Sequence, residues 1–173
     1  TKPLQTPPDL WLLSAPIRKE RMAFIVEKAT ELGVAKMQPV QTDYTNNGDK
    51  VRLEKLQAQV IEATEQCGGT FVPEMCAPLK LKTALRDWPA DRPLYFCDET
   101  AIGTAAGFGQ VPIAPKAAIL IGPEGGFSPQ ERSALSALPY AHTISLGPRI
   151  LRAETAAVAA LTLWQQQCGD WRG

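Results

Sequence analysis

The chain has 173 residues, of which 45% are hydrophobic and 21% charged, a composition typical of one folded domain. Eighteen Lys and Arg residues balance 18 Asp and Glu residues, so the chain lacks the basic excess of an autonomous nucleic-acid-binding protein. A single His excludes a histidine metal cluster, and no apolar run approaches the roughly 20 residues of a membrane-spanning helix. Attraction for RNA must then come from a local patch, a second copy of the chain or a part outside it.

Four cysteines are spread along the chain without a C-x-x-C pair: Cys67, Cys76, Cys97 and Cys168. This spacing counts against a paired-cysteine zinc or redox site and favours buried thiols of a cytoplasmic protein over disulfides. Residues 1–9 are rich in proline and polar residues, a composition typical of a linker. We therefore expect the folded domain to comprise residues 10–173.

Strand-like and helix-like segments alternate from residue 10 onward. Short apolar runs predict strands at residues 10–14, 34–40, 93–97, 117–121 and 142–146, although Pro39 weakens the second. Apolar residues three and four apart predict helices that end at Gly33 and Gly68, and a last helix at residues 153–167. A short helix is predicted near residues 81–87, and the capping sequence SPQE (128–131) predicts another, while residues 101–110 fit a helix or a loop. The alternation predicts a mostly parallel sheet of the α/β class with helices on both faces.

The segment IGPEGGFSPQE, residues 121–131, has the strand, turn and helix order of a phosphate-binding loop. It lacks the Lys-Ser or Lys-Thr of such a loop and the G-x-G-x-x-G spacing of a dinucleotide site, and it carries Glu124 instead. The segment SLGPRILRAETAA, residues 145–157, repeats the order of strand, Gly-Pro and helix. Ligands of parallel sheets bind beyond the carboxyl ends of the strands, so we expect the two turns to stand side by side there. Their glycines let backbone groups approach a ligand closely enough to read an adenine edge.

These two turns resemble the signature motifs of the RsmE family, the 16S ribosomal RNA (uracil-N3)-methyltransferases of the SPOUT superfamily. Residues 21–40 (RMAFIVEKATELGVAKMQPV) and 61–69 (IEATEQCGG) are also similar to the catalytic domain of that family. The resemblance implies a SPOUT-type sheet with a deep C-terminal trefoil knot, and a homodimer formed through the knot region. It further implies binding of S-adenosylmethionine and methylation of N3 of uracil-1498 in 16S ribosomal RNA of the small subunit. Family members carry an N-terminal PUA-like domain, and residues 1–9 resemble the linker that follows it.

Carried over residue by residue, the motifs imply a set of cofactor contacts, made largely through backbone groups. The implied contacts are Leu120, Ile121, Gly122, Glu124, Gly125, Gly126, Leu146, Gly147, Ile150, Leu151, Arg152 and Ala156. We expect Arg152 to orient the substrate and Glu154 to hold Arg152, with Thr155 in support. Arg149 is expected to contact RNA, and no metal is expected.

The chemistry of the reaction sets two further requirements. Uracil N3 carries a proton that must leave, and the negative charge then spreads onto O2 and O4, so the site needs a base and an oxyanion donor. Glu124 and Glu154 are both candidate bases, and Arg149 or Arg152 could hold the oxyanion or a phosphate. Glu154 equally fits a structural role, since a carboxylate at a helix start is favoured by the helix dipole.

Two segments depart from the pattern of the family. Cys67-Gly68-Gly69 stands where family members commonly have a basic residue, and Asp43-Tyr44-Thr45 where a basic-serine pair is common. Both positions are expected to face RNA. The absence of basic residues at these positions leaves a second interpretation open, a catalytically idle SPOUT-fold module for RNA binding or ribosome assembly. A third, a tRNA ribose methyltransferase, is disfavoured by the RILRAETA segment.

Overall fold

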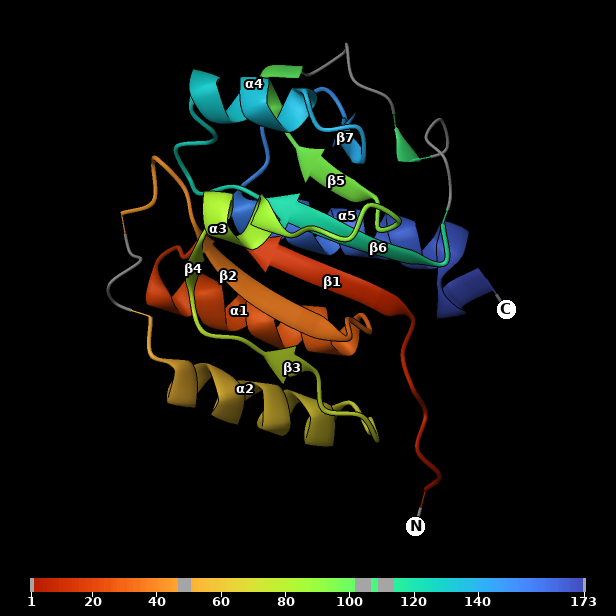
Figure 1. Ribbon diagram of the computed structural model, residues 1–173. Coiled ribbons are helices and arrows are strands. Elements are labelled where there is room, and N and C mark those ends of the chain that lie inside the picture. Colours follow the sequence, from red (N-terminus) through yellow and green to blue (C-terminus); the bar gives the residue numbers. More distant parts are fainter. Residues whose placement is uncertain (1, 47–50, 102–106, 109–113, 173) are drawn as a thin grey trace.

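The computed structural model describes residues 2–46, 51–101, 107–108 and 114–172, and a parallel sheet lies at its centre (Figure 1). Its strands are β1 (Asp9–Ser14), β2 (Lys36–Gln41), β3 (Glu74–Met75), β4 (Leu79–Lys80), β5 (Leu94–Cys97), β6 (Lys116–Ile121) and β7 (Ala141–Ile144). They follow the order β3-β2-β1-β6-β5-β7, and β4 also pairs with β2. Every pairing is parallel, so the carboxyl ends of the strands share one edge of the sheet. The predicted parallel sheet is confirmed.

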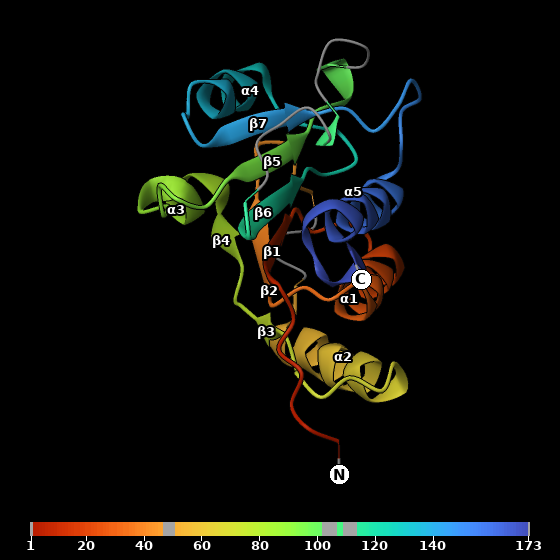
Figure 2. The same ribbon diagram turned by 90° about the vertical axis from the view of Figure 1, so that its right-hand side faces the viewer.

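Helices cover both faces of the sheet, as predicted (Figure 2). One face carries the longer helices α1 (Lys19–Glu31), α2 (Leu53–Gln66) and α5 (Ala153–Cys168), and the other carries α3 (Leu81–Arg86) and α4 (Pro129–Ser136). Two short 3-10 helices, η2 (Glu99–Ala101) and η4 (Asp170–Arg172), complete the described elements. None of the helices in the described part of the chain has the length and apolarity needed to cross a membrane.

The core consists of two apolar layers separated by the sheet. Along β6, Ala117, Ile119 and Ile121 face α1 and α5, whereas Ala118 and Leu120 pack with residues of α3 and α4. Because both faces are covered, the strand is an uninterrupted apolar run rather than an alternating one. Alternate residues still join opposite layers, but the uniform apolar pattern does not show which alternate set joins which layer.

The predicted elements match the structure closely, and the differences have local causes. β3 and β4 were not predicted, because strands of two residues are too short to show a period. Pro39 does lie within β2, in the interval between the residues paired with β3 and those paired with β4. On this side of β2 the pairing is interrupted between β3 and β4, so the missing N–H of Pro39 costs no hydrogen bond to either strand. Of residues 101–110, for which we predicted a helix or a loop, 102–106 and 109–110 lie outside the described residues.

Candidate cofactor-binding site

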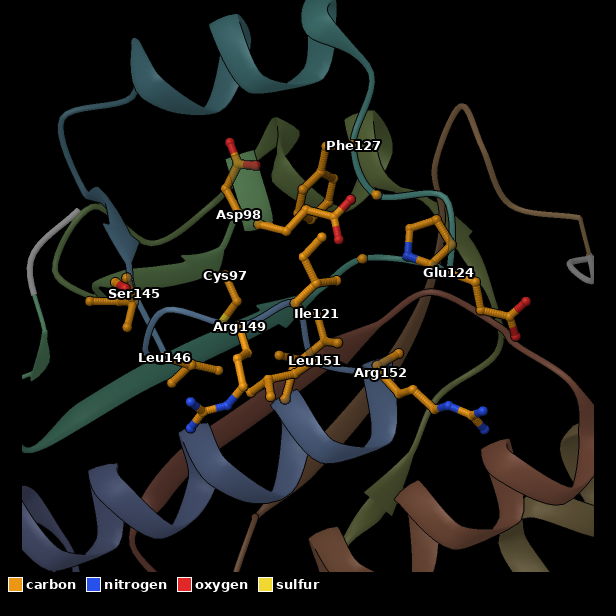
Figure 3. A pocket seen from close by; sticks show the side chains of 18 of the residues that line it. Cys97, Asp98, Ile121, Glu124, Phe127, Ser145, Leu146, Arg149, Leu151 and Arg152 are labelled. Carbon is orange, nitrogen blue, oxygen red and sulfur yellow. The ribbon is translucent and has the colours of Figure 1, made fainter. Parts of the chain in front are cut away.

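A pocket of about 250 Å³ opens at the carboxyl edge of the sheet, where β5, β6 and β7 end (Figure 3). Four segments line it: the end of β5, the turn after β6, the turn after β7 and the start of α5, with one residue from α1. The lining residues are Arg21, Cys97, Asp98, Glu99, Ile121, Gly122, Pro123, Glu124, Gly126, Phe127, Ile144, Ser145, Leu146, Gly147, Arg149, Ile150, Leu151, Arg152, Ala153 and Ala156. The two Gly-Pro turns therefore stand side by side, as predicted.

Two positions in the turn after β6 favour glycine, Gly126 for its backbone conformation and Gly122 for the space around it. Gly126 has φ +74°, a left-handed conformation that L side chains rarely adopt, and its N–H donates to the Pro123 carbonyl at 2.9 Å. A Cβ at Gly122 would lie 3.1 Å from the Phe127 ring, closer than ordinary van der Waals contact. The turn is thus held in one shape by its own backbone and by the ring that packs beneath it.

The helix that follows this turn is capped, and the cap is tied to the loop after β2. Ser128 Oγ accepts from the Glu131 N–H at 3.2 Å, and Glu131 Oε1 accepts from the Ser128 N–H at 3.0 Å, which is the predicted capping box. The Ser128 hydroxyl also donates to the Asp43 carboxylate, and Glu131 Oε2 accepts from the Asp43 N–H at 3.1 Å. A Cβ at Gly125 would lie 3.4 Å from Tyr44. Asp43 and Tyr44, which stand where the basic-serine pair is common, thus stabilise the turn by hydrogen bonds to the cap of α4 and by packing against Gly125.

The turn after β7 is more open. Gly147 has φ +103°, and a Cβ built on it meets nothing within 4 Å, so its backbone is accessible from the pocket. Leu146 and Leu151 are partly buried against the core, whereas Ile150 is 72% exposed. Arg152 precedes the first residue of α5, and its carbonyl accepts from the Ala156 N–H at 2.8 Å. The turn therefore offers backbone groups and apolar side chains together.

Three carboxylates and three guanidinium groups line the pocket. Arg21 Nη1 lies 3.3 Å from Glu124 Oε1, and Arg132, just outside the lining, lies 3.9 Å from Asp98 Oδ2. Arg149 and Arg152 are exposed and form no ion pair with any residue that the structure describes. The pocket thus presents two uncommitted cations near its mouth, where an anionic substrate could be held.

Cys97 contributes a thiol to the lining that stays neutral. Burial raises the pKa of Cys97 from 9.0 to about 12, because the surroundings disfavour the thiolate. The thiolate is the reactive form of cysteine, so Cys97 acts here as an apolar wall and not as a nucleophile. Among the described residues, no group of three or more His, Cys, Asp or Glu side chains is arranged to hold a metal ion.

Most of the predicted contacts meet at this pocket. Ten of the twelve predicted cofactor residues line it, as does Arg149. Leu120 does not, because it is fully buried on the opposite face of β6, and Gly125 faces Tyr44 instead. Thr155 is exposed outside the lining. Glu154 also lies outside it, and one of its carboxylate oxygens is buried without a partner among the described residues.

Several lining residues were not predicted from the sequence. Arg21 belongs to the first turn of α1, and the start of a crossover helix lies at the carboxyl edge of the strands by the geometry of the connection. Asp98 and Glu99 come directly after β5, at the end of a strand that was correctly predicted. The Asp98 side chain is 9% exposed and accepts from the Thr100 N–H at 3.0 Å. Position after a strand end was the available signal for Asp98 and Glu99, and position at the start of a crossover helix was the signal for Arg21.

Comparisons with known proteins identify the family of the chain. The family model of the RNA methyltransferase domain matches residues 4–165, and the chain therefore belongs to that family. The TrmH/SpoU tRNA modifying enzyme of A. aeolicus shares the fold, at 14% identity with a TM-score of 0.62 over 95% of this chain and 76% of that one. Among the curated relatives, ribosomal RNA small subunit methyltransferase E of Buchnera aphidicola is 31% identical over 98% of this chain and 70% of its own length. Within the family, the chain is a member of the ribosomal RNA small subunit methyltransferase E group.

Two solved structures of relatives contain a ligand. The ribosomal RNA small subunit methyltransferase E of Neisseria gonorrhoeae, bound to S-adenosyl methionine, is 31% identical with a TM-score of 0.86, over 95% of this chain and 68% of that one. A putative methyltransferase from Legionella pneumophila, in complex with the same cofactor, is 32% identical with a TM-score of 0.86, over 96% of this chain and 70% of that one. The chain thus spans about two thirds of the length of these proteins.

Proposed function

We propose that this chain is the catalytic domain of an S-adenosylmethionine-dependent methyltransferase that acts on N3 of uracil-1498 in 16S ribosomal RNA. The observation that carries the proposal is the pocket formed by the two Gly-Pro turns, in a fold whose relatives have been crystallised with this cofactor. The N3 position and the particular uracil follow from the resemblance of the two motifs to the RsmE family. Cytoplasmic action on the small ribosomal subunit follows from the same resemblance.

The residues of the pocket fit S-adenosylmethionine chemically. The cofactor has no phosphate, so a Gly-Pro turn with Glu124 in place of a lysine suits it. Ile121, Leu146 and Leu151 supply apolar surface, and the open Gly147 backbone supplies hydrogen-bonding groups for an adenine edge. Carboxylates in the lining, among them Glu124, complement the cofactor's amino group and sulfonium charge. When bound, the cofactor would supply an electrophilic methyl group.

We assign the remaining roles, which are proton transfer, charge stabilisation and RNA contact, to residues around the cofactor site. We propose that Glu124 accepts the N3 proton, because it lines the pocket with its carboxylate held at 3.3 Å from Arg21. Arg152 is proposed to stabilise the negative charge that develops on the uracil oxygens, and Arg149 to contact RNA phosphate. Glu154 and Thr155 lie outside the lining, so we propose that they act by positioning the start of α5 beneath Arg152.

The proposal includes a trefoil knot and a homodimer, as the resemblance implies. The knot would be formed by the segments around the two Gly-Pro turns. We propose that a second copy would cover the Ile150 side chain in the turn after β7, which is 72% exposed in the single chain. The mass of the chain in solution, measured by light scattering, tests the dimer directly.

Cofactor binding is the first test of the function. Isothermal titration calorimetry with S-adenosylmethionine, with ATP as the control ligand, is expected to show binding of the first and none of the second. Methylation of small ribosomal subunits that lack the modification follows, and the modified base is located by arrest of reverse transcription, since N3 methylation blocks base pairing. Binding without turnover would favour the idle module. No cofactor binding would refute the proposal.

A further inference from the structure

A second cavity, of about 310 Å³, lies between the starts of α1 and α2, outside the cofactor pocket. Helices α1 and α2 run side by side on the same face of the sheet (Figure 1). Three of the described residues that line the cavity are cationic, Lys19, Arg52 and Lys55, and none is acidic. The remaining lining is Gln59 and four apolar side chains. We call this the α1–α2 basic cavity.

The three cations are close enough to act on one another. The positive charge of Lys19, followed by that of Arg52, lowers the pKa of Lys55, because each charge disfavours another nearby. None of the three forms an ion pair with a residue in the part of the chain that the structure describes. All three residues are exposed, so water and salt screen their repulsion and the cluster can stand without a counter-charge from the protein. An anion in the cavity would relieve the repulsion.

The cavity and the cofactor pocket are connected through the first turn of α1. Lys19 and Met22 line the α1–α2 basic cavity, and Arg21, between them in sequence, lines the cofactor pocket and pairs with Glu124. Both sites therefore open at the carboxyl edge of the sheet. A polymeric ligand with one unit in the cofactor pocket could therefore place a neighbouring unit in the α1–α2 basic cavity.

We propose that the α1–α2 basic cavity binds backbone phosphates of the RNA substrate, next to the nucleotide that enters the cofactor pocket. This inference rests on the proposed function. Phosphate groups match the three cations, and the apolar lining suits the sugar that joins them. Free phosphate shares the same chemistry, but it would gain nothing from the apolar side chains or from the adjacent pocket.

The test compares two triple variants of the full chain. In one, Lys19→Gln, Arg52→Gln and Lys55→Gln remove the cavity cations. In the control, Lys80→Gln, Lys82→Gln and Arg86→Gln remove the same charge from the region of β4 and α3, which covers the opposite face of the sheet. Binding of a fluorescein-labelled single-stranded RNA is measured by anisotropy at several salt concentrations. S-adenosylmethionine affinity and thermal unfolding with added inorganic phosphate are measured in parallel.

The cavity variant is expected to bind RNA about tenfold or more weakly than the control. Its slope of log K against log salt should be less negative by about 0.7 for one lost phosphate contact and about 2 for three. S-adenosylmethionine affinity should be unchanged in both variants, which separates this result from a failure of the proposed function. Equal RNA affinity in the two variants, or no RNA binding by the wild-type chain, would overturn the inference. Phosphate stabilisation lost only in the cavity variant, with RNA affinity kept, would assign the cavity to a free anion instead.

Discussion

Arg21 Nη1 lies 3.3 Å from Glu124 Oε1, an ion pair between the first turn of α1 and the Gly-Pro turn after β6. Both side chains are partly exposed, so the pair adds little to stability by itself. The ion pair instead fixes the position of the Glu124 carboxylate at one side of the pocket. The proposed proton acceptor thus depends on a residue about a hundred positions earlier in the chain.

Replacing Glu124 tests its role as the base. Glu124→Gln is expected to lower kcat at saturating cofactor about 10²- to 10⁴-fold, since an amide of the same shape cannot take the N3 proton. The dissociation constant of S-adenosylmethionine should rise far less than kcat falls, because Asp98 and Glu99 still line the pocket. Methyl transfer to small subunits at saturating cofactor measures kcat. Glu65→Gln, an exposed site on α2, is the matched control. A Glu124→Gln variant with the wild-type rate would assign the base elsewhere.

The left-handed backbone at Gly126 makes a second prediction. Gly126→Ala is expected to lower the free energy of unfolding by about 1–2 kcal/mol, because the alanine Cβ strains a residue at φ +74°. Gly126→Asn should cost less, since asparagine tolerates this conformation better. Urea denaturation of the three proteins gives the order. Equal stability of all three would mean that the turn relaxes to another shape.

The contact between Asp43 and Ser128 can be measured with a double-mutant cycle. Ser128 is 5% exposed, its hydroxyl donates to Asp43, and its oxygen caps α4. Ser128→Ala is expected to cost about 0.5–2 kcal/mol of unfolding free energy, and Asp43→Ala about 1 kcal/mol. The double variant should lose less than the sum, with a coupling of at least about 0.5 kcal/mol by urea denaturation. Strict additivity would show that the loop after β2 does not support the turn.

Cys97 predicts a dependence on pH. Burial raises its pKa from 9.0 to about 12, so its stabilising contribution is complete below pH 9.0 and is lost as the pH rises toward 12. The unfolding free energy of wild type should therefore fall more steeply over this range than that of Cys97→Ala. At mildly alkaline pH, iodoacetamide should modify the exposed Cys67 well before Cys97. Faster labelling of Cys97, located by mass spectrometry, would contradict the neutral, buried thiol.

The sequence alone predicted the order of the main elements and the two turns that form the pocket. Local signals were sufficient for this: helical spacing in α1, α2 and α5, the capping box at Ser128, and the Gly-Pro turns after apolar runs. Ten of the twelve expected cofactor residues accordingly lie at the pocket. The strands β3 and β4 were missed because two residues carry no period.

The tertiary structure alone decided which distant residues meet. Leu120 and Ile121 are adjacent apolar residues in one buried strand, and the sequence does not distinguish them. In the folded sheet, Ile121 lines the pocket, whereas Leu120 packs on the opposite face with residues of α3 and α4. The approach of Arg21 to Glu124 depends on the order of strands, which places β1 beside β6. Periodicity and turn chemistry are properties of neighbouring residues, whereas strand order is settled by the burial of the whole sheet. The local sequence pattern therefore determined where the two Gly-Pro turns occur in the chain. The strand order of the sheet determined which distant residues, such as Arg21, lie next to them.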